Sequence, residues 1–187
     1  MIYIDDHIDD FDLTAALAAV SQERRDYALR YVNEVDRRLS VASFLQLKRA
    51  LALEFGMDSV PAFVREPNGK PRLEGFPDIH FSLSHCREAV ACAVDRVPVG
   101  IDVECIDRLD ADVVAVTMSE REQEQIAASP QPEVEFTRLW TMKESLYKLT
   151  GKFQDNDIRS MLANVAEYHF QTTVYPHFIC TLCTHNS

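Results

Sequence analysis

Two acidic residues lie close together within one apolar segment, and this pair is the first sign of chemistry in the sequence. The segment VPVGIDVECI at 97–106 reads as a β-strand, yet it contains Asp102 and Glu104. Side chains alternate between the two faces of a strand, so both carboxylates point one way and the apolar residues point the other way. Like charges on one face repel each other, so a partly buried pair needs a neutralising partner. A hard divalent cation such as Mg²⁺ would serve, because it binds oxygen ligands and bridges carboxylates to a substrate phosphate.

A second segment, FTRLWTMKESLYKLTG at 136–151, predicts an amphipathic helix that could complete such a site. Its polar face carries residues at i, i+4, i+7 and i+11, namely Thr137, Thr141, Glu144 and Lys148. If the helix packs across the strand, Glu144 would join the carboxylate pair and Lys148 would reach phosphate oxygens. The alternative is a surface ion pair between Glu144 and Lys148, which would contribute only a few tenths of a kcal/mol.

The segments around these residues predict the elements that would position them. Apolar runs bounded by turn residues predict strands at 1–4, 79–85, 88–94, 99–105 and about 173–183. The short connection DRVP indicates a hairpin between the strands at 88–94 and 99–105. Helices are expected at 21–38, at 41–55 and at about 133–149, with a shorter one after the capping-box pattern of Ser119 and Glu122. The order of elements therefore repeats loosely in the two halves of the chain.

Length and charge limit the classes of function. The 187 residues suit one large domain or two small ones. Nineteen basic and 30 acidic residues give a net charge of −11, which argues against a general nucleic-acid binder but leaves room for a local basic site. No apolar run has the length of a membrane span, and MIYIDDHIDD does not resemble a signal peptide. We expect a cytoplasmic protein that binds neither nucleic acid nor membrane.

Two further groups of residues could bind a metal, and each has a simpler explanation. Cys180 and Cys183 form a CxxC pattern, but their spacing in a strand places them on opposite faces. The odd number of five cysteines favours reduced thiols. The N-terminal stretch has five Asp residues and His7, yet it lacks the spacing and the glycine of an EF-hand. A solvated acidic surface is the favoured interpretation.

Four short blocks in order resemble the 4′-phosphopantetheinyl transferases, in particular the larger, surfactin-synthetase-activating type. VGIDVE and WTMKESLYK are similar to the paired signature of that family, Gly-Ile-Asp-x-Glu followed by Trp-x-x-Lys-Glu-Ser-x-x-Lys. NGKP at 68–71 and FSLSH at 81–85 match two further blocks. The resemblance extends over roughly 24–151. One departure is Gly151-Lys152-Phe153, where the family often has Gly-Lys-Gly.

The resemblance implies a reaction and a fold. The 4′-phosphopantetheine group of coenzyme A would pass to a serine of an apo acyl or peptidyl carrier protein, with Mg²⁺ as cofactor and adenosine 3′,5′-bisphosphate as by-product. The family fold is α+β, a pseudo-dimer of two similar halves with the site between them. We expect residues 1–98 to supply contacts to coenzyme A and residues 99–187 to supply the metal and catalytic residues. An internal pseudo-dimer also makes a monomer the expected state.

The resemblance also assigns roles to individual positions. Asp102, Glu104 and Glu144 match the metal ligands of the family. Glu144 also matches the proposed general base, and Lys148 matches the lysine that contacts the pyrophosphate and its leaving group. Ser84 and His85 match residues that contact the nucleotide end of coenzyme A, the 3′-phosphate especially. The other expected contacts of coenzyme A are Lys70, Arg65 and Arg24.

Two functions from different classes remain open from the sequence. The first is an active transferase, which the intact set of acidic residues and Lys148 favours. The second is a non-catalytic relative that binds coenzyme A or a partner without turnover. A Mg²⁺-dependent phosphohydrolase is a weaker alternative without a motif of its own. The seven basic residues within 21–49 predict either a solvated helix face or a positive region for phosphates or an acidic carrier protein.

Overall fold

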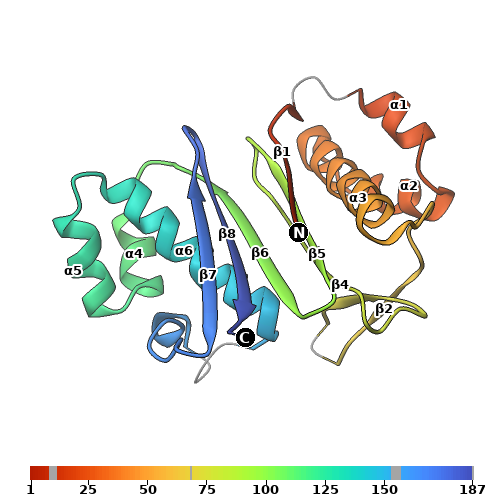
Figure 1. The fold of residues 1–187 in the computed structure, drawn as a ribbon. Coiled ribbons are helices and arrows are strands. Elements are labelled where there is room, and N and C mark those ends of the chain that lie inside the picture. Colours follow the sequence, from red (N-terminus) through yellow and green to blue (C-terminus); the bar gives the residue numbers. More distant parts are fainter. Residues whose placement is uncertain (9–11, 68, 153–156, 187) are drawn as a thin grey trace.

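Two three-stranded antiparallel sheets pack face to face, and helices cover their outer faces (Figure 1). The structure is a computed structural model that describes residues 1–8, 12–67, 69–152 and 157–186. Asp9 and Asp10 of the acidic stretch, Asn68 of the NGKP block and Phe153 lie outside the described residues.

The N-terminal sheet has the strand order β1-β5-β4, and the long helix α3 packs against it with α1 and α2 beside that helix (Figure 1). The elements of this half are β1 (Ile2–Asp5), α1 (Leu13–Ala18), α2 (Gln22–Ala28), α3 (Glu34–Phe55), β2 (Phe63–Arg65), β3 (Pro71–Leu73), β4 (His80–His85) and β5 (Val90–Asp95). β2 and β3 form a separate two-stranded hairpin.

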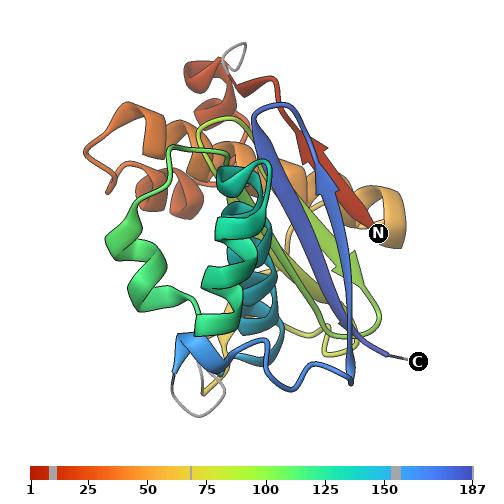
Figure 2. The ribbon, with the colours of Figure 1, turned by 90° about the vertical axis from the view of Figure 1, so that its left-hand side faces the viewer.

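The C-terminal sheet has the order β6-β8-β7, and helices α4 to α6 lie on its outer side (Figure 2). Its elements are β6 (Val99–Cys105), α4 (Ala111–Thr117), α5 (Glu120–Ala128), α6 (Pro132–Thr150), the 3₁₀ turn η3 (Ile158–Ser160), β7 (Tyr168–Val174) and β8 (Phe178–His185). In both halves the first strand pairs with the last strand, which becomes the central one. The predicted α+β fold with two similar halves is therefore confirmed.

Alternation along β6 separates the core from the candidate site. Val99, Ile101 and Val103 are buried between the sheets, against alanines of β5 and residues of β8. The other face of β6 looks toward α6. There Gly100 allows the helix to approach, because a Cβ at this position would lie 2.0 Å from the Ser145 carbonyl oxygen. Glycine is required here by the close approach of two backbones.

The two halves meet where an edge strand of each sheet lies beside the other. The backbone N–H of Ile101 in β6 donates to Ser82 Oγ in β4, 3.0 Å away. Further along both strands, Ser84 Oγ donates to the Asp102 carboxylate. The residue numbers rise together, so β4 and β6 run in parallel and are joined through side chains. This contact brings the FSLSH block next to the GIDVE block.

Several sequence-based boundaries are wrong, and each error has a local cause. The predicted boundary between the helices at 21–38 and 41–55 is wrong. α2 ends at Ala28, and α3 begins after Asn33, whose side chain caps the helix by accepting from the Val35 N–H. Ser21 and Gly56 act as predicted, at the start of α2 and the end of α3. The short helices α1 and α4 begin at aspartate caps that the sequence interpretation overlooked.

Two predictions of strand pairing also fail. β5 and β6 do not form a hairpin, because both edges of β5 are occupied by β1 and β4, and β6 pairs with β8 instead. The final strand is in fact the hairpin of β7 and β8. The capping box of Ser119 and Glu122 is confirmed at the start of α5. Within the described residues, no helix is long and apolar enough to cross a membrane.

Candidate active site at the junction of the two halves

Asp102, Lys148 and Ser84 form a compact hydrogen-bonded group between β6, α6 and β4. The Lys148 ammonium donates to Asp102 Oδ1 and to Ser84 Oγ, both at 2.7 Å. Ser84 Oγ in turn donates to the same Asp102 oxygen at 2.8 Å. Asp102 is only 2% exposed, so this is a buried carboxylate held by two donors. Lys148 thus makes its ion pair with Asp102 of β6 in the same half, and its hydrogen bond to Ser84 reaches the N-terminal half; the alternative of a surface pair on the helix is not what forms.

The second oxygen of Asp102 marks a place for a ligand. Oδ2 is buried and has no hydrogen-bond partner within the described part of the chain. A buried carboxylate oxygen without a donor costs free energy, and such an exception needs an explanation such as an ion or water. Glu104 lies two residues further along the same face, and the Trp140 indole N–H donates to its Oε1 at 3.4 Å.

The electrostatics of the site point to an excess of negative charge. Burial raises the pKa of Glu104 to about 7, with further increases from the charges of Asp102 and Glu144. Burial and the charge of Asp102 also raise the pKa of Glu144, although Lys148 opposes this shift. Carboxylates that repel one another in this way favour a bound cation. The three predicted ligands therefore share one electrostatic environment.

The carboxylates of Asp102, Glu104 and Glu144 are the type of ligand that Mg²⁺ prefers, but their oxygens do not form a tight cluster. Among the described residues, the group of three metal-binding side chains whose ligand atoms all lie within 4.8 Å is Asp5, Asp6 and His7, and not the predicted carboxylates. Mg²⁺ usually keeps several waters and uses one or two carboxylates together with substrate phosphates. Asp102 Oδ2, with Glu104 and Glu144 beside it, is consistent with that mode of binding.

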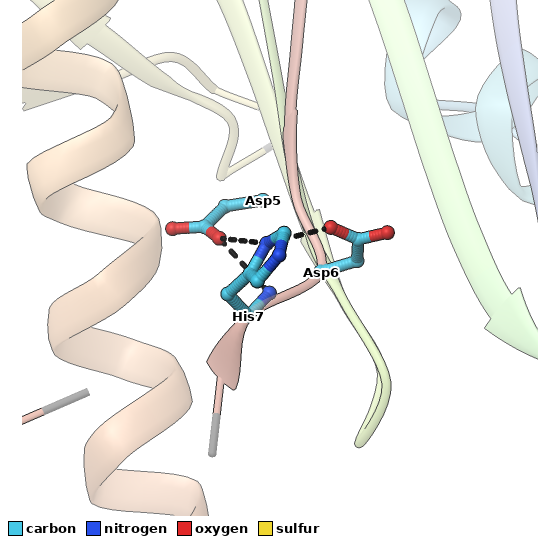
Figure 3. A group of neighbouring side chains, drawn as sticks. All are labelled: Asp5, Asp6 and His7. Carbon is cyan, nitrogen blue, oxygen red and sulfur yellow. Dashed lines mark hydrogen bonds and ion pairs between the residues drawn. The ribbon is translucent and has the colours of Figure 1, made fainter. Parts of the chain in front are cut away.

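The N-terminal acidic group has the features of a solvated surface. The His7 backbone N–H donates to Asp5 Oδ1, and His7 Nδ1 lies 3.0 Å from Asp6 Oδ1 (Figure 3). Asp6 and His7 are exposed, and exposed acidic groups are common without an ion. The interpretation as a solvated acidic surface is retained for the described part of the stretch.

A cavity of about 310 Å³ lies beside Lys148, between β3, β4 and the end of α6. Its lining residues are Gly69, Lys70, Pro71, Phe81, Ser82, Leu83, Tyr147, Lys148 and Gly151. Lys70 reaches across the two halves, where its ammonium donates to the carbonyl oxygens of Val99 at 3.1 Å and Leu149 at 3.5 Å. Burial lowers the pKa of Lys70, with partial compensation from Glu66. The cavity thus offers two lysines and an otherwise largely apolar wall.

His85 ends β4 one residue after Ser84, and part of its surface remains exposed. Partial burial of the ring lowers its pKa, and the positive charge of Lys148 lowers it further. Asp36 at the start of α3 and Asp102 act in the opposite direction. A phosphate placed here would raise the pKa and favour the protonated imidazole.

The structure does not bring the two predicted arginines to this group. The Arg24 guanidinium donates to the carbonyl oxygen and Oγ of Ser40, and it stacks over Tyr27 and Phe44. Arg65 donates to the Gly69 carbonyl oxygen within the β2–β3 hairpin. Both arginines therefore make these contacts inside the N-terminal half. Arg25 and Arg37 of the same basic region likewise donate to backbone carbonyls of that half.

Two other sequence-based interpretations are settled by the fold. Cys180 faces the core between the sheets and Cys183 packs with α6, so the CxxC pair lies on opposite faces as predicted. Both are free thiols. The contact between Trp140 and Glu104 was not predicted from the sequence. The spacing of four between Trp140 and Glu144 was the available signal, because it places the indole on the side of the helix that carries the acidic residue.

Two similar sheet–helix halves with a carboxylate–lysine centre at their junction define the class of this α+β protein. Comparison with known proteins narrows the class. A sequence model of the 4′-phosphopantetheinyl transferase superfamily matches residues 98–180, which include β6 and α6.

Curated relatives agree over most of the chain. The chain is 31% identical over 154 residues to a 4′-phosphopantetheinyl transferase of Bacillus subtilis, covering 81% of this chain and 69% of that protein. It is 33% identical over 151 residues to psf-1 of Bacillus pumilus (79% and 65%) and 28% identical over 154 residues to Sfp of Bacillus subtilis strain 168 (81% and 69%). The chain thus spans about two thirds of the length of these relatives. It belongs to the 4′-phosphopantetheinyl transferase superfamily, as the motifs predict.

Proposed function

We propose that the protein transfers the 4′-phosphopantetheine group of coenzyme A to a serine of an apo acyl or peptidyl carrier protein, with Mg²⁺ as cofactor and adenosine 3′,5′-bisphosphate as by-product. The observation that carries this proposal is the Asp102–Lys148–Ser84 group, in which one carboxylate oxygen has no partner among the residues that the structure describes, beside a cavity between the halves. Family membership supports the same reaction.

The residues of this chain divide the work of that reaction. Asp102, Glu104 and Glu144 would hold Mg²⁺, which when bound neutralises the charge of the pyrophosphate. Glu144 takes the proton of the carrier serine, directly or through water. The serine oxygen then bonds to the phosphorus that carries pantetheine, and the bond from this phosphorus to the oxygen of the nucleotide phosphate breaks. Lys148 donates to the oxygen on which charge develops.

Binding of coenzyme A is assigned mainly to the N-terminal half. Lys70 lines the cavity, and Ser84 and His85 follow one another at the end of β4. Residues 1–98 would supply these contacts, whereas residues 99–187 would supply the metal and catalytic groups. Arg24 and Arg65 would contact coenzyme A after their side chains leave Ser40 and Gly69, respectively.

Intact-mass analysis tests the function directly. Candidate apo carrier proteins are incubated with the protein, coenzyme A and Mg²⁺, and the expected result is the gain of one phosphopantetheine group on the carrier. Omission of Mg²⁺ should prevent the gain. A protein that binds coenzyme A in calorimetry but modifies no carrier would instead be a non-catalytic relative. Hydrolysis of coenzyme A without a carrier would indicate a phosphohydrolase.

Replacing His85 by alanine should weaken the binding of coenzyme A about 10-fold or more, but should change the binding of 3′-dephospho-coenzyme A much less. The reason is the loss of a charge-assisted hydrogen bond to the 3′-phosphate, worth roughly 1.5–3 kcal/mol when desolvated. Titration calorimetry with both ligands measures the difference. His80→Ala, at the opposite end of β4, is the matched control. Equal losses for both ligands would remove His85 from this role.

Raising the pH should destabilise the metal-free protein through Glu104. The folded pKa of about 7 exceeds the ordinary value of 4.5, so the folded state holds this proton more tightly. The stabilisation is complete below pH 4.5 and is lost as the pH rises through about 7. In thermal melts without metal, wild type and Glu104→Gln should melt together at about pH 5, and the variant should melt higher at about pH 8. Mg²⁺ at the higher pH should close the gap, whereas a constant difference at both pH values would contradict the prediction.

A further inference from the structure

Lys143 is a fully buried lysine next to the proposed base, and the assignments above give it no role. It is 1% exposed and precedes Glu144 in α6. At about 100° per residue, Lys143 and Lys148 lie about 140° apart around the helix axis. Lys143 therefore points away from the site and toward α4, α5 and η3.

The ammonium of Lys143 has a complete set of three acceptors. It donates to the Thr117 carbonyl oxygen at 2.8 Å, to Glu122 Oε2 at 2.8 Å and to the Ile158 carbonyl oxygen at 3.0 Å. Three acceptors satisfy all three N–H donors of a lysine. Each acceptor belongs to a different element, α4, α5 and η3. One ammonium therefore ties α6 to α4, α5 and η3.

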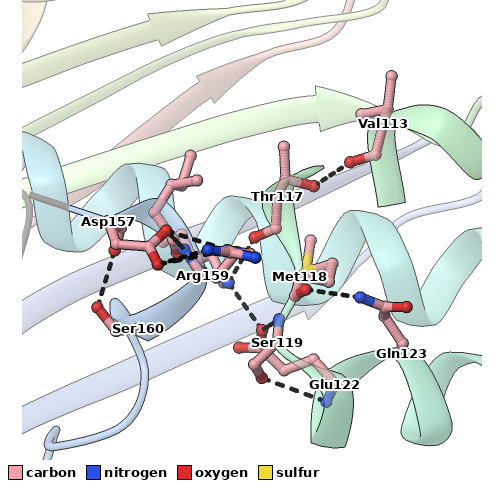
Figure 4. Close-up of polar contacts among 11 residues, drawn as sticks. Val113, Thr117, Met118, Ser119, Glu122, Gln123, Asp157, Arg159 and Ser160 are labelled. Carbon is pink, nitrogen blue, oxygen red and sulfur yellow. Dashed lines mark hydrogen bonds and ion pairs between the residues drawn. The ribbon is translucent and has the colours of Figure 1, made fainter. Parts of the chain in front are cut away.

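The acceptors are themselves held in place. Glu122 Oε2 also accepts the Ser119 N–H at 2.7 Å, because Glu122 is the third residue of the capping box of α5 (Figure 4). Thr117 is the last residue of α4, where carbonyl oxygens lack intrahelical donors and attract a cation. The η3 turn is fixed by Asp157, which accepts from the Arg159 N–H (Figure 4). Each element that supplies an acceptor to Lys143 is thus held by hydrogen bonds of its own.

Stability alone does not account for a lysine in this place. A buried ion pair can often be replaced by apolar side chains of similar volume without loss of stability. Apolar side chains, however, lack the directional contacts that set the rotation of a helix. The opposite side of α6 rests on Gly100, where the contact is also close. A rotation of about 10° would move a side-chain tip some 6 Å from the axis by about 1 Å, and an error of 1 Å can cost about 10²-fold in rate.

We propose that Lys143 is a positioning residue, whose three hydrogen bonds set the rotation and height of α6 so that Glu144 and Lys148 meet Asp102 and the substrate. The inference deepens the proposed transferase function and rests on it for its kinetic consequence. It predicts a loss in the maximal rate rather than in the affinity for coenzyme A, because the cavity wall from the N-terminal half is unchanged.

The test compares two variants with a matched control. Lys143→Met removes the ammonium and leaves the Glu122 charge buried, so its melting temperature should fall by roughly 10 °C. The double variant Lys143→Met/Glu122→Gln removes both charges and should regain most of that loss, but should keep a kcat at least about tenfold below wild type. Its KM for coenzyme A should stay within about threefold of wild type. Arg138→Met, which breaks a half-buried ion pair on the same helix, should change little.

Amide hydrogen exchange of residues 144–149 provides a readout that does not require turnover. It should be faster in the double variant than in wild type, and all rates are measured at about 10 °C, where every variant is folded. A double variant with wild-type kcat and wild-type exchange would overturn the positioning role and leave Lys143 as a charge partner of Glu122. If wild type itself modifies no carrier, the proposed function fails, and the exchange measurement still decides whether Lys143 fixes α6.

Discussion

Substituting alanine for Asp102 is expected to abolish productive Mg²⁺ binding and to reduce phosphopantetheine transfer by about 10³-fold, at the upper end of single electrostatic contributions to catalysis. Asp102 serves two roles through its two oxygens. Oδ1 holds Lys148 and Ser84, and Oδ2 has no protein partner within the described residues. The substitution therefore removes a metal ligand and also releases the lysine that contacts the substrate.

The Asp102 variant should nevertheless fold. Lys148 keeps about a quarter of its side chain in solvent, so its charge can be hydrated when the carboxylate is lost. The measurement is the Mg²⁺ dependence of single-turnover transfer, together with a thermal melt. Glu104→Ala is the matched control on the same strand face, and its effect should be milder because water can replace one Mg²⁺ ligand. Normal transfer with ordinary Mg²⁺ dependence in the Asp102 variant would show that the proposed site is wrong.

Glu144→Gln and Lys148→Met should each lose about 10²-fold or more in transfer rate while binding coenzyme A within about tenfold of wild type. Glutamine keeps the shape of Glu144 but removes its charge and basicity. Methionine keeps much of the bulk of Lys148 but removes the charge that faces the departing phosphate. Interactions made mainly in the transition state lower the rate more than they lower substrate affinity.

The design of this experiment separates chemistry from binding and folding. Single-turnover transfer to an apo carrier is measured beside calorimetric binding of coenzyme A and a thermal melt. Lys152→Met, at an exposed lysine just beyond α6, controls for a general loss of positive charge. Two folded variants that bind coenzyme A and transfer at a near-normal rate would favour the non-catalytic relative.

Local patterns in the sequence were sufficient for the elements that carry the site. The alternation in 97–106 correctly separated the core residues Val99, Ile101 and Val103 from the carboxylates, and the polar face of 136–151 correctly placed Lys148 toward the strand. The capping box at Ser119 was also found. These features depend on residues within a few positions of one another, where helix and strand periods act directly. The four motif blocks then indicated the family.

Pairing between distant segments was decided by the tertiary structure. The hairpin expected between β5 and β6 did not form, because a local turn signal carries no information about which strands already occupy each edge. The contacts of the Arg24 guanidinium with Ser40 and Phe44 were likewise not predicted from the sequence, and its expected contact with coenzyme A stays a prediction. A basic residue in a motif-like position can contact either a ligand or the backbone of its own half, and the sequence does not distinguish these two outcomes.

By itself, the sequence determined the type of each long element, the face on which its polar residues lie, and the chemistry that aspartate, glutamate and lysine could perform together. The meeting of Lys148 with Asp102 and Ser84 joins residues 46 and 64 positions apart, and only the packing of α6 on β6, together with the position of β4 beside β6, brings them within 2.7 Å. The same holds for Lys143, since burial of a lysine depends on three acceptors from elements that are separate in sequence. Hydrophobic periodicity acts over a few residues, whereas the satisfaction of a buried charge is settled by whichever groups the completed fold places around it.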